Sequence, residues 1–199
     1  SFGRDFSRGE LASTLNHLLS YKKFLDSEND LAIIMEDDAD FIIDDFIFVI
    51  KRLIKIIDQR KPEVYLLTPV ISYLKNNVKD LSEDYKIVKV IQSWDSSGYI
   101  INREAAKKMI KANSRSWFIA DDWIRYKRHG KVDIYSVIPT IIKQNLDIFD
   151  SNLMASRNKA IKSRSLKYIL SRLSHKIISD IKKYFWLIPF KGYIRNTDV

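Results

Sequence analysis

The sequence has 199 residues, 46% hydrophobic and 30% charged, a composition that favours one globular domain with a substantial core. It contains no cysteine, which excludes disulfides, thiolate metal sites and cysteine nucleophiles. The longest unbroken apolar run, Tyr184 to Phe190, is far shorter than the ~20 residues that span a bilayer. No secretory signal is visible, and we expect an N-terminal piece to precede Ser1.

The net charge of +9 is concentrated towards the C-terminus. Residues 1–158 contain 24 Lys and Arg against 23 Asp and Glu, whereas residues 159–199 contain ten against two. The sequence therefore predicts a nearly neutral body followed by a basic tail. Such a tail suits nucleic acid, anionic lipid or solvent alone, so the global charge is no argument for nucleic-acid binding.

The first predicted element is a helix that begins at a capping box, Ser7 with Glu10. Its apolar positions follow a helical period: Leu11, Leu15, Leu18, Leu19 and Leu25. A short apolar run at 31–35 then predicts a buried strand, which leads directly into an acidic cluster at 36–40.

The following segments alternate between helix and strand patterns. Asp44 or Asp45 is predicted to cap a helix that ends near Ile57. Strands are predicted at 64–67, 87–91, 98–101 and 132–138, helices at 103–112 and from Asp121-Asp122 to Gly130, and a polar loop at 75–85. This alternation predicts an α/β fold with a mostly parallel sheet.

The acidic cluster Glu36-Asp37-Asp38-Ala39-Asp40 is the sharpest chemical feature. Four carboxylates in five residues repel one another, and a cation offsets that charge. In an extended chain Glu36, Asp38 and Asp40 point to one side, and an oxygen-only ligand set suits Mg²⁺ or Mn²⁺. The alternative interpretation is a solvated acidic turn that caps the next helix.

Three further patterns carry weaker chemical signals. Asp121-Asp122 beside Trp123 suits a general base next to a sugar-stacking ring, or simply a helix N-cap with a core tryptophan. His17 alone is typical of a structural histidine. The stretch 94–99 suits either a pocket wall or a turn. Glycine-rich phosphate loops and a GxSxG elbow are absent from the sequence, which disfavours dehydrogenases, P-loop NTPases and serine hydrolases.

In order, these segments resemble glycosyltransferase family 25, the bacterial lipooligosaccharide and lipopolysaccharide galactosyl- or glucosyltransferases. The resemblance covers roughly residues 7–150, with Asn16 where that family usually has serine. The matching segments are Gly9-Glu10-Leu11, Asn16-His17-Leu18, Leu31 to Asp38, Gly98 to Lys108 and Ala120-Asp121-Asp122-Trp123.

The resemblance implies a GT-A-like mixed sheet flanked by helices and an inverting, metal-dependent transfer from a nucleotide sugar. It implies that Glu36, Asp37 and Asp38 hold a Mn²⁺ or Mg²⁺ diphosphate, and we expect His17 and Tyr99 in the donor site. We expect Asp122 as the base and Asp121 as the cap. The family's N-terminal strand is not evident upstream of Ser1.

We therefore expect a catalytic domain at 1–158 and a basic amphipathic helical tail at 159–199 that lies on an anionic membrane. The expected partners are a UDP-sugar and a glycan or lipid-linked glycan, without nucleic acid. The expected location is cytoplasmic, at the inner face of the cell membrane. The alternatives are a metal-dependent hydrolase or nucleotidyltransferase that uses the same carboxylates, and a non-enzymatic binding module that acts through its tail.

Overall fold

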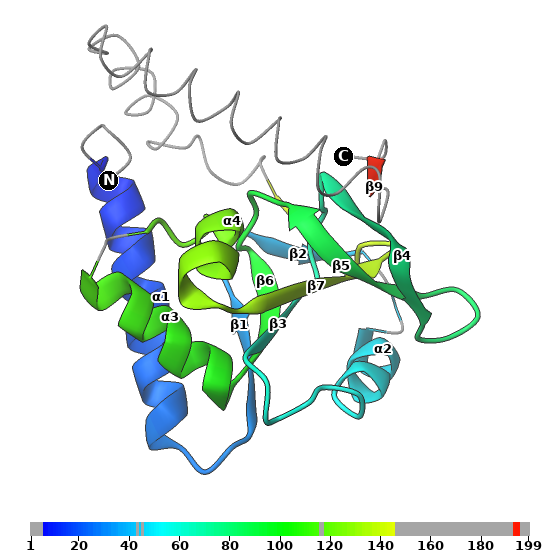
Figure 1. The fold of residues 1–199 in the computed structure, drawn as a ribbon, viewed down its shortest axis with the longest axis horizontal. Helices are drawn as coiled ribbons and strands as arrows, with labels where there is room; N and C mark the ends of the chain where they lie inside the picture. The colour runs from blue at the N-terminus through cyan, green and yellow to red at the C-terminus, as the bar shows by residue number, and fades with distance from the viewer. Residues whose placement is uncertain (1–5, 43, 45, 116–117, 146–192, 196–199) are drawn as a thin grey trace, which may run out of the picture.

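The computed structural model describes residues 6–42, 44, 46–115, 118–145 and 193–195 (Figure 1). It is a mixed α/β fold in which helices cover both faces of a seven-stranded sheet. The strands, in sheet order, are β1 (Leu31–Met35), β6 (Gly98–Asn102), β3 (Glu63–Leu66), β7 (Asp133–Ile138), β5 (Lys86–Gln92), β4 (Ser72–Asp80) and β9 (Tyr193–Arg195). A separate ribbon pairs β2 (Ala39–Phe41) with β8 (Ile142–Gln144).

The expected mostly parallel sheet is wrong. Of the strand pairs in the described sheet, only β3 and β7 are parallel. The alternation of strands and helices predicted which elements exist, but it carried no information on strand direction. β6 enters between β1 and β3 and runs against both, which replaces one potential parallel pair, β1 with β3, by two antiparallel pairs.

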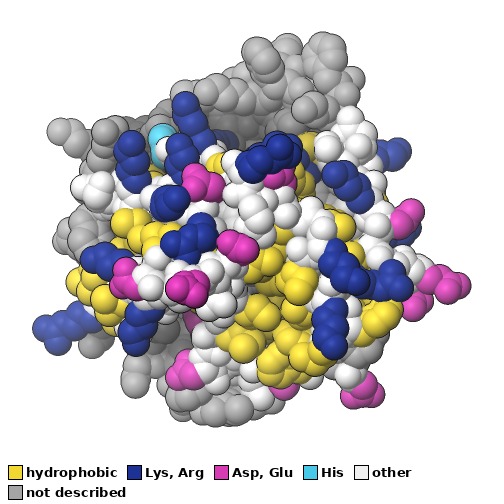
Figure 2. Space-filling view, turned by 90° about the horizontal axis from the view of Figure 1, so that it is seen from below, with side chains coloured by type: hydrophobic (Ala, Val, Ile, Leu, Met, Phe, Trp, Pro, Cys, Tyr) yellow, Lys and Arg dark blue, Asp and Glu magenta, His cyan; other side chains and the backbone are white. Residues whose placement is uncertain are grey.

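Two cores lie on opposite faces of the sheet. On one face α1 (Arg8–Asp26) packs against α3 (Arg103–Arg115), followed by the short α4 (Trp123–Arg125) and a π-helical turn at Tyr126–Gly130. On the other face α2 (Phe46–Leu53) covers the centre of the sheet. α2 ends four residues before the predicted Ile57, and exposed apolar side chains remain around it at Ile47, Phe48, Ile54 and Ile56. Figure 2 shows hydrophobic side chains gathered on the face that is seen from below.

α1 begins at the predicted capping box, with reciprocal hydrogen bonds between Ser7 and Glu10. Its periodic leucines form only part of the packed face: Leu18 and Leu25 are partly buried against the core, whereas Leu11, Leu15 and Leu19 are exposed. The buried face carries Glu10, Thr14, His17, Tyr21 and Phe24. Polar side chains on this face can be buried because two of them, His17 and Tyr21, hydrogen-bond to Tyr99 on the sheet. Hydrophobic periodicity does not detect such bonds.

Two strand predictions also need correction. β1 is a strand, but it lies at the edge of the sheet, and Ile33 and Met35 are exposed rather than buried. The predicted loop at 75–85 contains most of β4, which pairs with β5 across a register shift between Tyr73 and Val78. The polar side chains at 75–80 are all exposed, so this part of the strand lacks the apolar alternation that a sequence pattern detects.

The strand directions bring the following strand ends to one edge of the sheet. β1, β3 and β7 end there, while β6 and β5 begin there, as the register pairs Met35 with Gly98, Leu66 with Tyr99 and Ile138 with Lys86 show. We call this the carboxyl edge. In open α/β sheets, ligands bind beyond the carboxyl ends of parallel strands.

The predicted helix at 166–188 lies outside the described residues, as does most of the predicted tail. Its described part, Tyr193–Arg195, pairs with β4 as β9. Among the described residues, no helix combines the length and the apolar character that a membrane crossing requires.

Candidate functional site

Glu36 is the centre of a side-chain cluster at the carboxyl edge. Its Oε1 lies 2.8 Å from His17 Nε2 on α1 and accepts a hydrogen bond of 2.7 Å from the Ser96 hydroxyl. The other ring nitrogen, Nδ1, lies 2.6 Å from the Tyr99 hydroxyl at the start of β6. Burial opposes the ionisation of Glu36, but the hydrogen bonds from His17 and Ser96 hold its pKa below its usual value. The structure thus joins three predicted donor-site residues: His17, Glu36 and Tyr99.

The rest of the acidic cluster does not form an extended strand. The Glu36 carbonyl accepts a hydrogen bond from the Ala39 amide, so the chain turns at Asp37 and Asp38. Asp37 is exposed, and Asp38 Oδ2 accepts a hydrogen bond of 2.6 Å from Gln144 on β8. Asp40 lies on β2, exposed and opposite Lys143. The expectation that Glu36, Asp38 and Asp40 share one side of a strand is therefore wrong.

Asp95 is a carboxylate to which the sequence patterns assigned no role. It precedes β6, and its Oδ1 accepts a hydrogen bond of 2.8 Å from the Ser97 amide. Burial, helped by the charges of Glu36 and Asp38, raises the pKa of Asp95. Asp95 lies in the polar stretch 94–99 before a predicted strand, and this position was its only sequence signal. The sequence did not indicate that this strand, β6, begins beside the end of β1.

The observed environment suits a divalent cation. Asp38 Oδ1 is buried without a hydrogen-bond partner among the described residues, although a carboxylate oxygen is a strong acceptor. Burial is the main cause of the raised pKa of Asp95, and the smaller contribution from the charges of Glu36 and Asp38 is the part that a bound cation would offset. Within the described ranges, no three His, Asp or Glu side chains already stand in a metal-binding arrangement. The carboxylate oxygens are therefore ligands of the type that a hard cation prefers, but the described side chains do not already surround a cation site.

The pair Asp121-Asp122 is linked to this cluster by the next residue, Trp123. The Trp123 indole donates a hydrogen bond of 2.8 Å to the Asp95 carbonyl and packs edge-to-face on Tyr99, with ring centroids 5.0 Å apart. The predicted cap was the wrong member of the pair: Asp122 is the N-cap, and its Oδ1 accepts from the Arg125 amide at 3.1 Å.

Asp122 is enclosed, whereas Asp121 is partly exposed. The Asp122 side chain is 3% exposed and its Oδ2 lies 3.2 Å from Arg125 Nε. Burial raises the pKa of Asp122, against the hydrogen bond from the Arg125 amide. Of the two residues, Asp121 is the more exposed, although its Oδ1 is buried.

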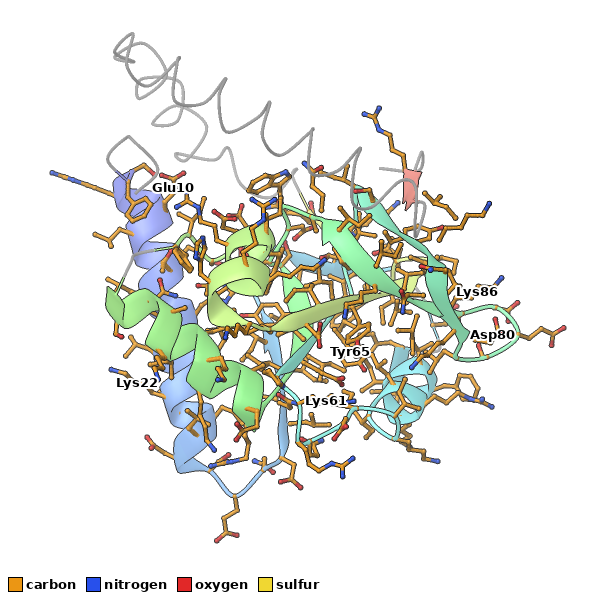
Figure 3. The ribbon with its side chains drawn as sticks, in the orientation of Figure 1. Glu10, Lys22, Lys61, Tyr65, Asp80 and Lys86 are labelled. Atoms are coloured by element: carbon orange, nitrogen blue, oxygen red, sulfur yellow. The ribbon has the colours of Figure 1, made fainter. Side chains whose placement is uncertain are left out.

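A pocket of about 450 Å³ opens at the same carboxyl edge. It lies where β3 and β7 end and β5 begins, and Lys86 on its rim is labelled in Figure 3. Its polar and aromatic lining includes Thr68, Tyr73, Asp84, Lys86, Thr140 and Lys143. Thr68 is 1% exposed, and its hydroxyl has no hydrogen-bond partner among the described residues. The pocket combines an aromatic ring, hydroxyls and charges of both signs with apolar residues such as Ile42, Val70 and Ile138, a mixed lining of the kind found in small-molecule sites.

Comparison with known proteins gives one family. The sequence model described as glycosyltransferase family 25 (LPS biosynthesis protein) matches residues 1–124. That range contains the whole Glu36 cluster, Asp95 and the pair Asp121-Asp122. A search of curated proteins gave no match.

Proposed function

Because the chain belongs to glycosyltransferase family 25 (LPS biosynthesis protein), we propose that it transfers a hexose, galactose or glucose, from a UDP-sugar to a lipooligosaccharide, lipopolysaccharide or other surface glycan. The family makes the chain a glycosyltransferase of LPS biosynthesis. The donor, the acceptor and an inverting course of reaction are our proposal, as is a GT-A-like reading of the sheet.

One observation carries the proposal: the pairing of β1 with β6 and the bond from Ser96 to Glu36 bring the segment of Asp95 beside that of Glu36 and Asp38 at the carboxyl edge, inside the family-matched range. A nucleotide sugar carries its negative charge on the diphosphate, so carboxylates bind it through a cation. Asp38, with its unpartnered Oδ1, and Asp95 are the residues that would hold Mn²⁺ or Mg²⁺, with Glu36 beside them. When bound, the ion supplies Lewis-acid neutralisation of the departing diphosphate.

The proposed transfer is a single displacement. The acceptor hydroxyl gives its proton to a carboxylate as its oxygen bonds to the anomeric carbon. The bond from that carbon to the UDP oxygen breaks on the opposite side, and UDP leaves with the electron pair. We assign the base to Asp121 rather than to Asp122, because Asp122 is enclosed and already paired with Arg125.

The pocket at the ends of β3 and β7 is our proposed place for the acceptor sugar. Its volume of about 450 Å³ lies within the range of small-molecule sites. Tyr73 offers a ring for stacking, while Asp84 and Thr140 offer hydrogen-bond partners for sugar hydroxyls.

A membrane location follows from the tail sequence alone. Ten basic residues against two acidic ones in residues 159–199 favour contact with anionic lipid, where a lipid-linked acceptor is anchored. We propose that the protein acts at the cytoplasmic face of the cell membrane.

The function is tested by a donor screen. UDP-galactose and UDP-glucose are incubated with the full chain, Mn²⁺ and a lipooligosaccharide acceptor, and UDP release is measured with and without the acceptor. Acceptor-dependent release with one donor is expected. Release that is equally fast without acceptor would instead support the hydrolase alternative, and no release with any nucleotide sugar would contradict the proposal.

A further inference from the structure

A continuous hydrogen-bonded chain runs from the interior of the protein to Glu36. The Tyr21 hydroxyl is bonded to the Tyr99 hydroxyl, which is bonded to His17 Nδ1. His17 Nε2 in turn faces Glu36 Oε1 at 2.8 Å. The four groups come from α1, β6 and the end of β1. The hydrogen-bonded chain therefore passes from Tyr21 on α1 to Tyr99 on β6, returns to α1 at His17, and ends at Glu36 on the carboxyl edge.

Burial increases from Glu36 inward. The Glu36 side chain is 26% exposed, whereas His17 is 5% exposed and Tyr21 and Tyr99 are fully buried. The His17 ring also stacks on the Tyr99 ring, with an interplanar angle of 13°. Breaking one of these hydrogen bonds would leave a buried polar group unpaired, which is costly. Both the hydrogen bonds and the packing of the rings therefore hold the four side chains in one arrangement.

One assignment of protons satisfies every bond in the chain. An ionised Glu36 is an acceptor only, so both of its partners donate: Ser96 through its hydroxyl and His17 through Nε2–H. In a neutral imidazole Nδ1 then carries a lone pair, which accepts from the Tyr99 hydroxyl. Because the Tyr99 hydroxyl donates its proton outward to His17, its oxygen accepts from the Tyr21 hydroxyl. The ionised Glu36 thus places a proton on Nε2 of His17, and the Tyr99 hydroxyl satisfies the opposite ring nitrogen.

We propose that His17 is a positioning residue of the transfer site: it presents Nε2–H to Glu36 and holds that carboxylate in one orientation at the carboxyl edge, while the Tyr99 hydroxyl, itself bonded to Tyr21, satisfies Nδ1. The proposal rests on the proposed function in so far as it places the donor at Glu36. The near-complete burial of His17 and Tyr99 favours this indirect role over direct contact with the donor.

The proton arrangement is tested without any assay of activity. The nitrogen chemical shifts of His17 are measured at pH 7 by NMR in the full-length protein and in Tyr99→Phe. We expect a proton on Nε2 in the wild type and in Tyr99→Phe, with the Nδ1 shift alone changed in the variant because that nitrogen loses its hydrogen bond. A ring with its proton on Nδ1 alone in the wild type would leave no Nε2–H for Glu36 and would overturn the proposal, whatever the outcome of the donor screen.

The positioning role is tested with His17→Phe and His17→Gln. Phenylalanine keeps a ring but cannot donate, whereas glutamine retains an N–H group for Glu36; Asn16→Ala, at the exposed neighbouring position, is the matched control. Turnover and UDP affinity in the presence of Mn²⁺ are measured, together with thermal denaturation. We expect His17→Phe to lose at least tenfold in kcat and several-fold in UDP affinity, and His17→Gln to recover most of both.

A merely structural role predicts a different pattern. Both His17 variants would then melt at lower temperature to the same extent, with kcat unchanged below the transition or with no advantage of Gln over Phe, and either result would overturn the proposal. If His17→Phe does not fold, Tyr99→Phe and His17→Gln carry the same comparison, because each changes hydrogen bonding with little loss of packing volume.

Discussion

At the scale of single residues, the two adjacent carboxylates Asp121 and Asp122 have separable roles. Asp122 caps α4 and is ion-paired to Arg125 in a buried site. We expect Asp122→Ala to lower the free energy of unfolding by about 1–3 kcal/mol, because it removes an N-cap and leaves Arg125 without this partner. Asp122→Asn should cost less, since asparagine is an equally good N-cap. Urea denaturation of the three proteins measures these differences.

Asp121→Asn should have the opposite signature. As the proposed base it contributes to the rate, so we expect kcat to fall by ~10²-fold or more with near-normal stability and donor affinity. The control is Asp122→Asn, whose loss of activity should follow its loss of folded protein. If Asp122→Asn loses kcat while fully folded and Asp121→Asn does not, the two roles are exchanged; if neither loses rate, the base lies elsewhere.

At the scale of elements, the sequence predicted individual helices and strands well, but it predicted the arrangement of the strands in the sheet poorly. The capping box of α1 and the strands at β3, β5, β6 and β7 are confirmed, because their signals lie within a few adjacent residues. The edge position of β1 and the direction of β6 depend on which strands pair, which no local pattern encodes. β2 and β8, three residues each, were too short for periodicity to reveal.

The same limit applies to the site. His17, Glu36 and Tyr99 were predicted from motifs, and the structure brings them together. Asp95 was assigned no role because its importance arises from the pairing of β1 with β6, which sets it near Glu36 and Asp38. The buried role of Asp122 depends on its bond to Arg125, which a pair of adjacent aspartates does not reveal.

Gly98 makes the start of β6 sensitive to added volume. A Cβ at this position would lie 2.6 Å from Cδ1 and 3.3 Å from Cγ2 of Ile142, a fully buried side chain on β8. We expect Gly98→Ala to destabilise the fold by about 1–3 kcal/mol through overpacking. Ile142→Val removes the nearer methyl group, so the double variant should be more stable than the two separate effects predict.

A double-mutant cycle by chemical denaturation measures this coupling. Ala120→Gly, at another buried position near the site, controls for the general effect of exchanging alanine and glycine. Strict additivity of Gly98→Ala and Ile142→Val would show that the close contact does not limit packing between β6 and β8.

At the scale of the whole molecule, the uneven charge predicts where the protein binds membranes. A truncation before residue 159 also removes β9 from the sheet, so charge neutralisation is the cleaner change. We expect the wild type to co-sediment with anionic vesicles at low salt and to be released near 0.5 M salt, where screening shortens to roughly a few ångströms. A tail variant with five Gln substitutions should stay in the supernatant: Lys167, Arg172, Lys176, Lys182 and Lys183.

The matched control removes the same number of charges from exposed positions of the body: Lys22, Lys51, Lys55, Lys75 and Lys79. This variant should bind anionic vesicles nearly as well as the wild type, because the body is almost neutral and the tail is unchanged. Equal loss in both variants would mean that total charge, not the tail, determines binding, and undiminished binding of the tail variant would contradict the membrane proposal.

We propose that carboxylates at the carboxyl edge bind a nucleotide sugar through a divalent cation. Calorimetric titration of UDP measures this binding and its dependence on the cation. The titration is run on the full chain with Mn²⁺, with EDTA, and with Mn²⁺ on Asp38→Asn; Asp40→Asn, exposed on β2, is the neighbouring control. We predict binding with Mn²⁺ in the wild type and little change in Asp40→Asn, but at least a tenfold loss with EDTA and in Asp38→Asn. Equal UDP affinity with EDTA, or in a folded Asp38→Asn protein, would contradict the account.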